Sequence, residues 1–133
     1  MCIQTILLIE DNADILDNLD EYLQLEGYHT LMTKNGKKGI ELANAFIPDL
    51  IICDVVMFEM NGHEVLRSLL GSVQTAAIPF IFSSSLSEKN DETESRKLGA
   101  DDYIVKPYEL ETLLKMAKNW IKSGSKRQLC PTS

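Results

Sequence analysis

Four short apolar segments of this chain end in charged or hydroxyl side chains, which limits the folds it can adopt. The segments are 6–9, followed by Glu10 and Asp11; 50–53, followed by Asp54; 80–82, with Ser84 just after them; and 103–105, followed by Lys106. Apolar segments this short are typical of strands buried on both faces of a parallel sheet. Because the carboxyl ends of parallel strands open into one crevice, we expect these polar groups in a single pocket. They suit a divalent cation and a phosphoryl group.

The rest of the sequence alternates between strand and helix patterns. Strands are expected at 5–9, 29–33, 49–53, 79–82 and 102–105, and helices at 12–26, 35–47, 64–70, 87–98 and 109–122. The most apolar strand, 49–53, is expected at the centre of the sheet, and 29–33 nearer an edge. Five strands alternating with five helices predict right-handed βαβ units in a three-layer α/β sandwich. The pattern alone leaves the strand order open.

Two of the predicted helices differ in how much they can bury. Helix 87–98 is polar over most of its circumference, so we expect it to pack weakly on the sheet. Helix 109–122 has an apolar stripe, and Trp120 beside that stripe is interpreted as the edge of the core. The segment 123–133 offers little to bury and is expected to be a disordered tail. The folded domain is therefore assigned to 1–122.

Composition excludes several classes of protein. The net charge of −7 argues against binding nucleic acid through phosphate contacts, which needs a basic face. No apolar stretch approaches the ~18 residues of a membrane span, and no signal peptide is visible. Cys2, Cys53 and Cys130 are widely spaced and odd in number, which disfavours a disulfide framework or a zinc site and favours a cytoplasmic protein. His29 and His63 are isolated and are expected at the surface.

Asp54 is the candidate nucleophile of the predicted pocket. An aspartate carboxylate at the tip of a central strand can attack phosphorus and form an aspartyl phosphate. Glu10 and Asp11 would crowd the pocket with negative charge, which Mg²⁺ relieves through its preference for oxygen ligands. Lys106 can pair with Asp54 at rest and with the phosphoryl group later. The hydroxyl of Ser84 can donate to a phosphoryl oxygen.

Each of these residues has a plainer interpretation when considered alone. Asp54 could cap the following loop, and Glu10 with Asp11 could be an acidic pair favoured by a helix dipole. Lys106 could be a solvated loop lysine. Ser84 lies in a run of three serines that could serve turn chemistry, which leaves its assignment open by one position. Only the combination of these residues favours phosphoryl transfer.

The combined motifs resemble the receiver domain of two-component response regulators over residues 5–122. The motifs are Glu10-Asp11; Asp54 with Met57 and Gly62; Ser84; and Gly99-Ala100-Asp101-Asp102-Tyr103 with Lys106-Pro107. No single motif is specific, but the set in this order is. The resemblance implies a flavodoxin-like sheet with strand order 2-1-3-4-5.

The resemblance also implies a role for each candidate residue. The implied magnesium ligands are Glu10, Asp11, Asp54 and the main-chain carbonyl of Val56. The implied phosphoryl-transfer residues are Asp54, Lys106 and Ser84, with a cis peptide between Lys106 and Pro107. The implied switch pair is Ser84 with Tyr103: Ser84 would move toward the phosphoryl group, and Tyr103 would turn into the vacated space.

Partners follow from the same resemblance. The phosphate would come from a histidine kinase or a phosphotransfer protein, and a downstream effector would contact the face built from 87–98, 102–105 and 109–122. The chain would be a monomer or a phosphorylation-dependent homodimer. Beyond self-phosphorylation and self-dephosphorylation it would not be an enzyme. The sequence leaves open whether it is a stand-alone regulator or part of a longer one.

Several positions depart from the common family pattern. Phe58 stands where proline is common, Asn61 where aspartate is frequent, and Ser84 where threonine is commoner. Val56 and Leu86, two residues past the nucleophile and past Ser84, are both apolar. Because neither can orient an attacking water, slow self-dephosphorylation is predicted.

Two other functions remain as alternatives. A Mg²⁺-dependent phosphohydrolase of the haloacid dehalogenase type also uses an aspartate nucleophile, but it has a second aspartate two residues later, where this chain has Val56. A pseudo-receiver would bind partners without being phosphorylated. The intact acidic pair, Asp54 and Lys106 argue against that alternative.

Overall fold

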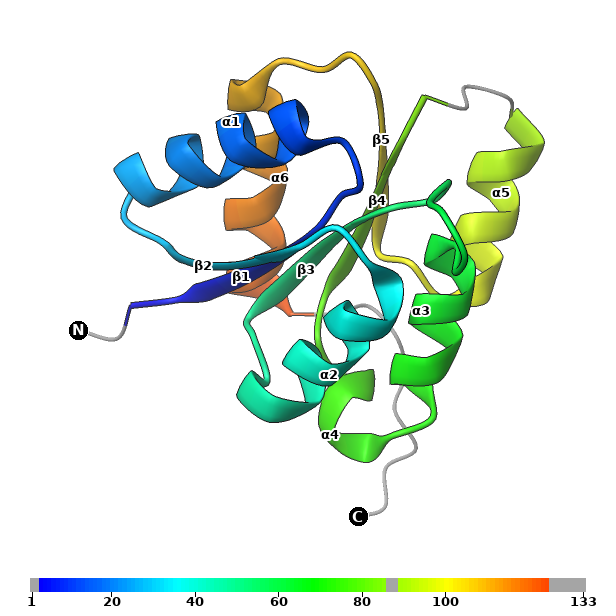
Figure 1. Ribbon diagram of the computed structural model, residues 1–133. Helices are drawn as coiled ribbons and strands as arrows, with labels where there is room; N and C mark the ends of the chain where they lie inside the picture. Colours follow the sequence, from blue (N-terminus) through cyan, green and yellow to red (C-terminus); the bar gives the residue numbers. More distant parts are fainter. Residues whose placement is uncertain (1–2, 86–88, 125–133) are drawn as a thin grey trace.

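Five parallel strands form a single sheet in this computed structural model, which describes residues 3–85 and 89–124. The strand order is β2-β1-β3-β4-β5 (Figure 1), which confirms the predicted flavodoxin-like order. The strands are β1 (Thr5–Ile9), β2 (His29–Thr33), β3 (Leu50–Asp54), β4 (Phe80–Ser84) and β5 (Asp102–Val105). Because every neighbouring pair is parallel, the carboxyl ends of all five strands lie at the same end of the sheet.

The helices cover both faces of the sheet, as the three-layer prediction required. α1 (Ala13–Leu25) and α6 (Leu110–Ser123) pack on one face, and α2 (Gly36–Phe46), α3 (Gly62–Leu70), α4 (Val73–Ala76) and α5 (Lys89–Leu98) lie on the other (Figure 1). α4 is a single turn that adds a sixth helical segment to the five expected. This turn comes directly after α3. Within it, the Thr75 hydroxyl donates to the carbonyl of Leu69 at 2.6 Å, so a local hydrogen bond rather than an apolar periodicity accounts for the turn.

Each face of the sheet has its own apolar core. Phe80 and Phe82 of β4 belong to the cluster beneath α2, α3 and α5, whereas Ile81 belongs to the cluster beneath α1 and α6. This alternation is the period of two that a strand imposes on its side chains. Trp120 is 5% exposed within the second cluster, which confirms that it belongs to the core.

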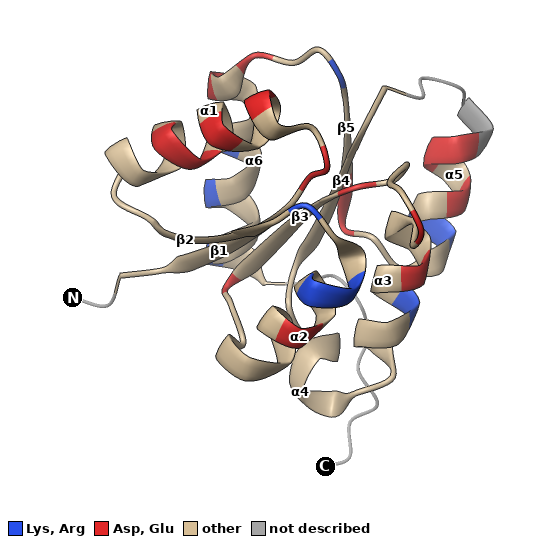
Figure 2. Ribbon diagram, in the orientation of Figure 1, with Lys and Arg blue, Asp and Glu red and all other residues tan. Residues whose placement is uncertain are grey.

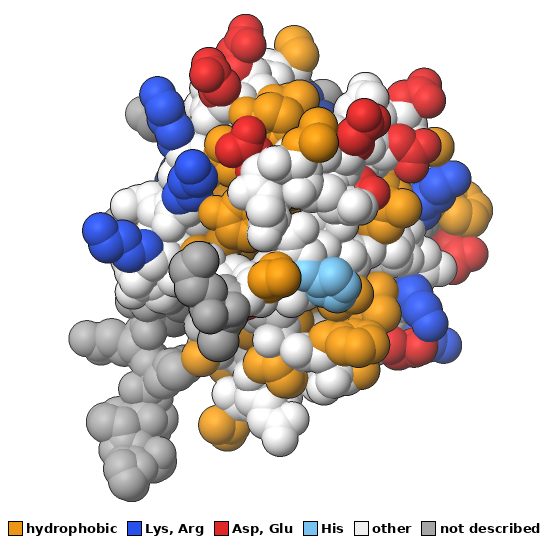
Figure 3. Space-filling model, turned by 90° about the vertical axis from the view of Figure 1, so that its left-hand side faces the viewer, with side chains coloured by type: hydrophobic (Ala, Val, Ile, Leu, Met, Phe, Trp, Pro, Cys, Tyr) orange, Lys and Arg blue, Asp and Glu red, His pale blue; other side chains and the backbone are white. Residues whose placement is uncertain are grey.

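The position of β2 at an edge of the sheet is also confirmed. Two residues of this strand, His29 and Met32, are exposed, and the exposure of His29 was predicted. In contrast, β3 and β4 are buried along their whole length. The space-filling view of this side of the molecule shows hydrophobic side chains separated by polar and charged ones (Figure 3). Single exposed apolar residues of this kind are ordinary on a protein surface.

The loop after β3 packs directly against the backbone of Asp54. Gly62 donates its N–H to the carbonyl of Val55 at 2.7 Å, and a Cβ at position 62 would lie 2.3 Å from the carbonyl oxygen of Asp54. α3 begins at Gly62, two residues before the predicted start, because Asn61 and Glu64 form a capping box. Hydrogen bonds to Val55 on one side and to Glu64 on the other therefore hold the Asn61-Gly62 turn in place.

The prediction that His63 lies at the surface is wrong. Its ring is half-buried and meets Phe82 edge-on, with ring centroids 5.2 Å apart, and its Nε2 lies 2.8 Å from Oγ of Ser95 in α5. Position 63 faces α5, and the neighbour of a helix is a property of the tertiary fold that the local sequence does not reveal.

Some predictions concern residues outside the described part of the chain. They are the start of the predicted helix at Ser87, the residue Leu86, and the tail beyond Gly124. α6 continues one residue past its predicted end, to Ser123. Among the described residues, no helix has both the length and the apolar character needed to cross a membrane.

Candidate functional site

Three carboxylates meet where β1 and β3 end. Ile9 pairs with Cys53, so the residues that follow, Glu10 and Asp54, emerge side by side. Carboxylate oxygens of Glu10, Asp11 and Asp54 all lie within 4.8 Å of one another. Such a group of oxygen donors can hold a hard divalent cation. Figure 2 shows further acidic residues around this end of the sheet, on α1 and α5.

The ammonium group of Lys106 completes the site from the end of β5. Its Nζ donates to Oε1 of Glu10 at 2.6 Å and to Oδ2 of Asp54 at 3.2 Å. The Lys106 N–H bonds to the carbonyl of Ser84, which holds this residue beside the end of β4. The peptide between Lys106 and Pro107 is cis, as the resemblance implied. The structure thus brings together the predicted carboxylates and the predicted ammonium.

The charged groups in this pocket shift one another's pKa. Burial raises the pKa of Asp54, and the charge of Glu10 raises it further, to about 7, although Lys106 opposes both effects. Burial would lower the pKa of Lys106, but its contacts with the two carboxylates outweigh burial and leave that pKa above its usual value. The folded chain therefore has more negative charge here than one lysine can neutralise, which is the condition that favours cation binding.

The raised pKa of Asp54 predicts that metal-free stability falls as the pH rises. Between its usual pKa of 3.8 and about 7, the folded chain keeps a proton that the unfolded chain releases. The free energy of unfolding must therefore decrease with pH through this window and level off above it. We expect a decrease on the order of 2 kcal/mol, because solvent screens part of the effect. Urea unfolding in EDTA at about pH 5 and about pH 8 measures it.

Asp54→Asn is the control for this pH dependence because its amide does not titrate. Its free energy of unfolding should vary less than that of the wild type over the same pH range. An equal decrease in both proteins would assign the pH dependence to other groups.

Ser84 and Tyr103, the predicted switch pair, are both buried. Ser84 is fully buried at the end of β4, whereas its neighbour Ser85 is exposed. Tyr103 is 5% exposed, so its ring already lies inside the protein, and its hydroxyl donates to Asp91 of α5. Burial raises the pKa of Tyr103; the hydrogen bond to Asp91 raises it further, and a hydrogen bond with Ser84 acts in the opposite direction. The predicted inward turn would therefore start from a ring that is already buried.

Two residues near the site were missed by the sequence analysis. Asp91 lies in a helix that is polar over most of its circumference, so no local pattern distinguishes it from its neighbours. Its contact with Tyr103 is what identifies it. Tyr108 lies just past the cis peptide; burial and the charges of Glu10 and Asp54 raise its pKa to about 12. Its position directly after the Lys106-Pro107 motif was the one available signal.

Two predicted positions lie on the loop that follows Asp54. The side chain of Val56 is exposed, at 56%, and that of Phe58 is more so, at 82%. Neither side chain fills the carboxylate pocket. Phe58 instead presents an apolar ring to solvent on the loop that follows Asp54.

Comparisons with known proteins agree on one family. The family model of the response regulator receiver domain matches residues 6–118. PilH of Pseudomonas aeruginosa is 34% identical over 110 residues, which are 83% of this chain and 91% of PilH. The response regulator SaeR of Staphylococcus aureus is 32% identical over 114 residues, or 86% of this chain, and the chain spans 49% of SaeR.

A solved structure extends this agreement to the fold. The receiver domain of a signal transduction histidine kinase from Syntrophus aciditrophicus is 34% identical to this chain, with a TM-score of 0.83, and the alignment covers 98% of each chain. The family match reaches from the second residue of β1 through β5 and includes the whole carboxylate pocket. This chain belongs to the response regulator receiver domain family, the phosphate-accepting domains of two-component signalling.

Proposed function

We propose that this receiver accepts its phosphoryl group on Asp54. The observation that carries the proposal is the position of Asp54 among three carboxylates that can hold a divalent cation, with Oδ2 of Asp54 3.2 Å from the Nζ of Lys106. A carboxylate oxygen of Asp54 would attack phosphorus of a phosphohistidine as the bond from phosphorus to the imidazole nitrogen breaks. The imidazole keeps the electron pair of that bond and takes up a proton.

The chain's own residues would provide the remaining chemistry of the transfer. Lys106 would release its bond to Asp54 and pair with an oxygen of the phosphoryl group. Ser84 would donate its hydroxyl to another phosphoryl oxygen, since it lies at the end of the neighbouring strand. Mg²⁺, held by the three carboxylates and the main-chain carbonyl of Val56, would neutralise the charge that gathers in the pocket.

Two features weigh against the alternative functions. A phosphohydrolase with an aspartate nucleophile needs an acid/base carboxylate two residues later, and Val56 offers none. A pseudo-receiver has no use for a complete pocket, whereas here Glu10, Asp54 and Lys106 are joined by direct hydrogen bonds. Phosphate acceptance without catalytic turnover is the function that the pocket supports best.

The partners are proposed on the same basis. The donor would be a histidine kinase or a phosphotransfer protein, and an effector would contact the face of α5, β5 and α6. We place the domain at residues 1–122 and the protein in the cytoplasm, where reducing conditions keep a thiol such as that of the buried Cys53 out of disulfides. The phosphorylated chain would act as a monomer or as a homodimer.

The test is the stoichiometry of phosphate uptake. Wild-type protein is incubated with acetyl phosphate and Mg²⁺, and its intact mass is measured. We expect one phosphoryl group per chain and no continuing release of inorganic phosphate beyond slow loss from the protein. Rapid turnover of a phosphomonoester would support the hydrolase instead, and the absence of any uptake would support the pseudo-receiver.

The lifetime of the phosphorylated state is a separate prediction. The exposed side chain at position 56 is valine, which can neither bind nor orient a water molecule for attack on the phosphoryl group. We expect the acyl phosphate to persist for minutes or longer in Mg²⁺ buffer. Loss of radiolabelled phosphate over time measures it. Val56→Gln, which restores a polar group, should shorten the lifetime, and loss within seconds in the wild type would contradict the prediction.

A further inference from the structure

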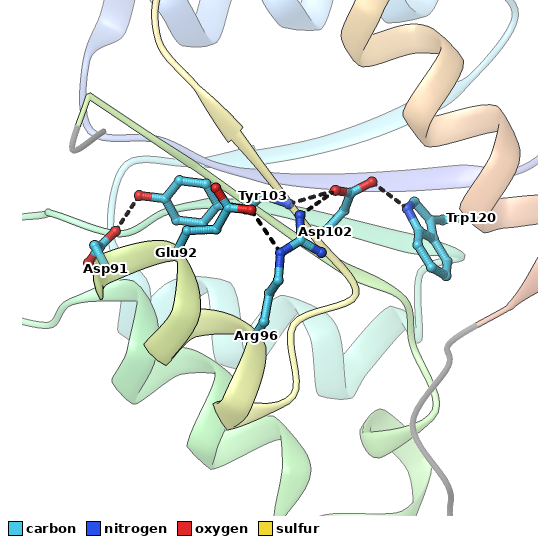
Figure 4. Close-up of polar contacts among 6 residues, drawn as sticks. All are labelled: Asp91, Glu92, Arg96, Asp102, Tyr103 and Trp120. Carbon is cyan, nitrogen blue, oxygen red and sulfur yellow. Dashed lines mark hydrogen bonds and ion pairs between the residues drawn. The ribbon is translucent and has the colours of Figure 1, made fainter. Parts of the chain in front are cut away.

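β5 is the edge strand of the sheet, and one of its side chains contacts both helix layers. Oδ1 of Asp102 lies 3.2 Å from the guanidinium of Arg96 in α5, on one face of the sheet. Oδ2 of the same carboxylate accepts a 2.8 Å hydrogen bond from Nε1 of Trp120 in α6, on the other face (Figure 4). Among the described residues no strand pairs with the outer edge of β5, so this carboxylate can reach around the edge of the sheet.

The residue next to Asp102 connects α5 to the phosphorylation site. Tyr103 belongs to the core cluster beneath α2, α3 and α5, and its hydroxyl donates to Asp91 in the first turn of α5 (Figure 4). The same hydroxyl interacts with Ser84 at the end of β4, the strand that pairs with β3 and its Asp54. A continuous series of polar contacts therefore runs from Ser84 through Tyr103 and α5 to Asp102 and Trp120.

Polar contacts dominate the attachment of α5. Within the described side chains of 91–98, Ser95 alone is fully buried, and it is paired with His63. Arg96 is 45% exposed and also bonds Glu92 at 2.9 Å. Contacts of this kind exchange for contacts with water at little net cost, unlike the burial of a large apolar side chain. Leu98 at the end of α5 packs against the core but is only partly buried, so α5 can change its position at a lower cost than a helix held by large, fully buried apolar side chains.

We propose that Asp102 couples the position of α5 to α6, so that phosphorylation of Asp54 alters the surroundings of Trp120. The proposal rests on the proposed function of Asp54. A phosphoryl oxygen would compete for the Ser84 hydroxyl, and Tyr103 would lose that partner. The resulting shift of α5 would draw Arg96 away from Asp102. The carboxylate bound to the indole would then lose its positive counterpart, and the signal would extend to the helix layer across the sheet.

Trp120 is the only tryptophan of the chain, so its fluorescence reports on this contact directly. The full chain is treated with acetyl phosphate and Mg²⁺, and the tryptophan emission spectrum and intact mass are recorded on the same sample. We expect a change of emission that develops with phosphate uptake. Arg96→Gln should lose most of that change while taking up phosphate normally. Lys97→Gln, the same change of charge at the next, exposed position, should keep it.

A second variant separates the ion pair from the hydrogen bond to the indole. Asp102→Asn retains a carbonyl oxygen that can accept from Nε1 of Trp120 but loses the negative charge that attracts Arg96. It should keep a buried tryptophan before phosphorylation and show little change after it. Phosphate uptake with unchanged emission in the wild type, or a full change in Arg96→Gln or Asp102→Asn, would overturn the coupling and leave the assignment of Asp54 intact. Absence of uptake in the wild type would overturn both.

Discussion

Asp54→Asn is expected to take up no phosphoryl group from acetyl phosphate or from a phosphorylated histidine donor. Asparagine has nearly the shape of aspartate and can still accept a hydrogen bond from Lys106, so the pocket should remain assembled. Its amide oxygen is a far weaker nucleophile than a carboxylate, so the acyl phosphate cannot form. Since Asp54 lies crowded against Glu10, removing its charge should also leave the protein at least as stable as the wild type near neutral pH.

The matched control for this variant is Asp49→Asn, which makes the same chemical change at the other end of β3. Asp49 is exposed and accepts a 2.8 Å hydrogen bond from the N–H of Thr5, which an asparagine can also accept. It should take up phosphate like the wild type. Intact mass measures both variants. Normal uptake by Asp54→Asn would move the phosphoacceptor to another residue, with Asp11 the next carboxylate in the pocket.

Lys106→Met is expected to lower the free energy of unfolding by about 3 kcal/mol above neutral pH in EDTA, because it leaves two buried carboxylates without their cation. The Lys106 side chain is 15% exposed and bonds both Glu10 and Asp54, so methionine replaces its length but not its charge. The loss should shrink as the pH falls, since the carboxylates then take up protons and no longer need a counter-charge. Mg²⁺ should restore part of the stability for the same reason.

Urea unfolding of Lys106→Met beside Lys118→Met tests this expectation. Lys118 is exposed in the middle of α6, and its replacement should change stability by a few tenths of a kcal/mol at most. The decisive quantity is the difference between the two variants at alkaline and at acidic pH. Equal losses, or a Lys106→Met loss that does not depend on pH, would mean that the ammonium is not what neutralises Glu10 and Asp54.

The positions of the site residues could be read from the sequence because they follow from strand pattern alone. Apolar segments of three or four residues identify buried parallel strands, and the next residue on each strand must lie at the common carboxyl end. That rule places Asp54, Glu10 and Lys106 in one pocket without knowledge of the strand order. The order itself came from the family resemblance, because periodicity does not say which strands are neighbours.

The sequence was less informative where one helix contacts another. His63 and Ser95 are 32 residues apart, and neither has a local signal that predicts the other. Asp91 and Arg96 looked like solvated charges on a polar helix, since a helix pattern shows which face is apolar but not which polar residue meets a partner. The short helix α4 was missed because a side-chain hydrogen bond of Thr75, not an apolar period, accompanies it.

The sequence by itself determined the layered α/β architecture and the residues of the carboxylate pocket, because both depend on the local alternation of apolar and polar side chains. Only the tertiary structure decided that Tyr103 is buried against Asp91 and that Asp102 joins Arg96 to Trp120 around the edge of the sheet. Those contacts depend on which strand forms the edge and on how two helices on opposite faces are placed beside it. No local pattern encodes that placement, since it is fixed by packing of the whole domain.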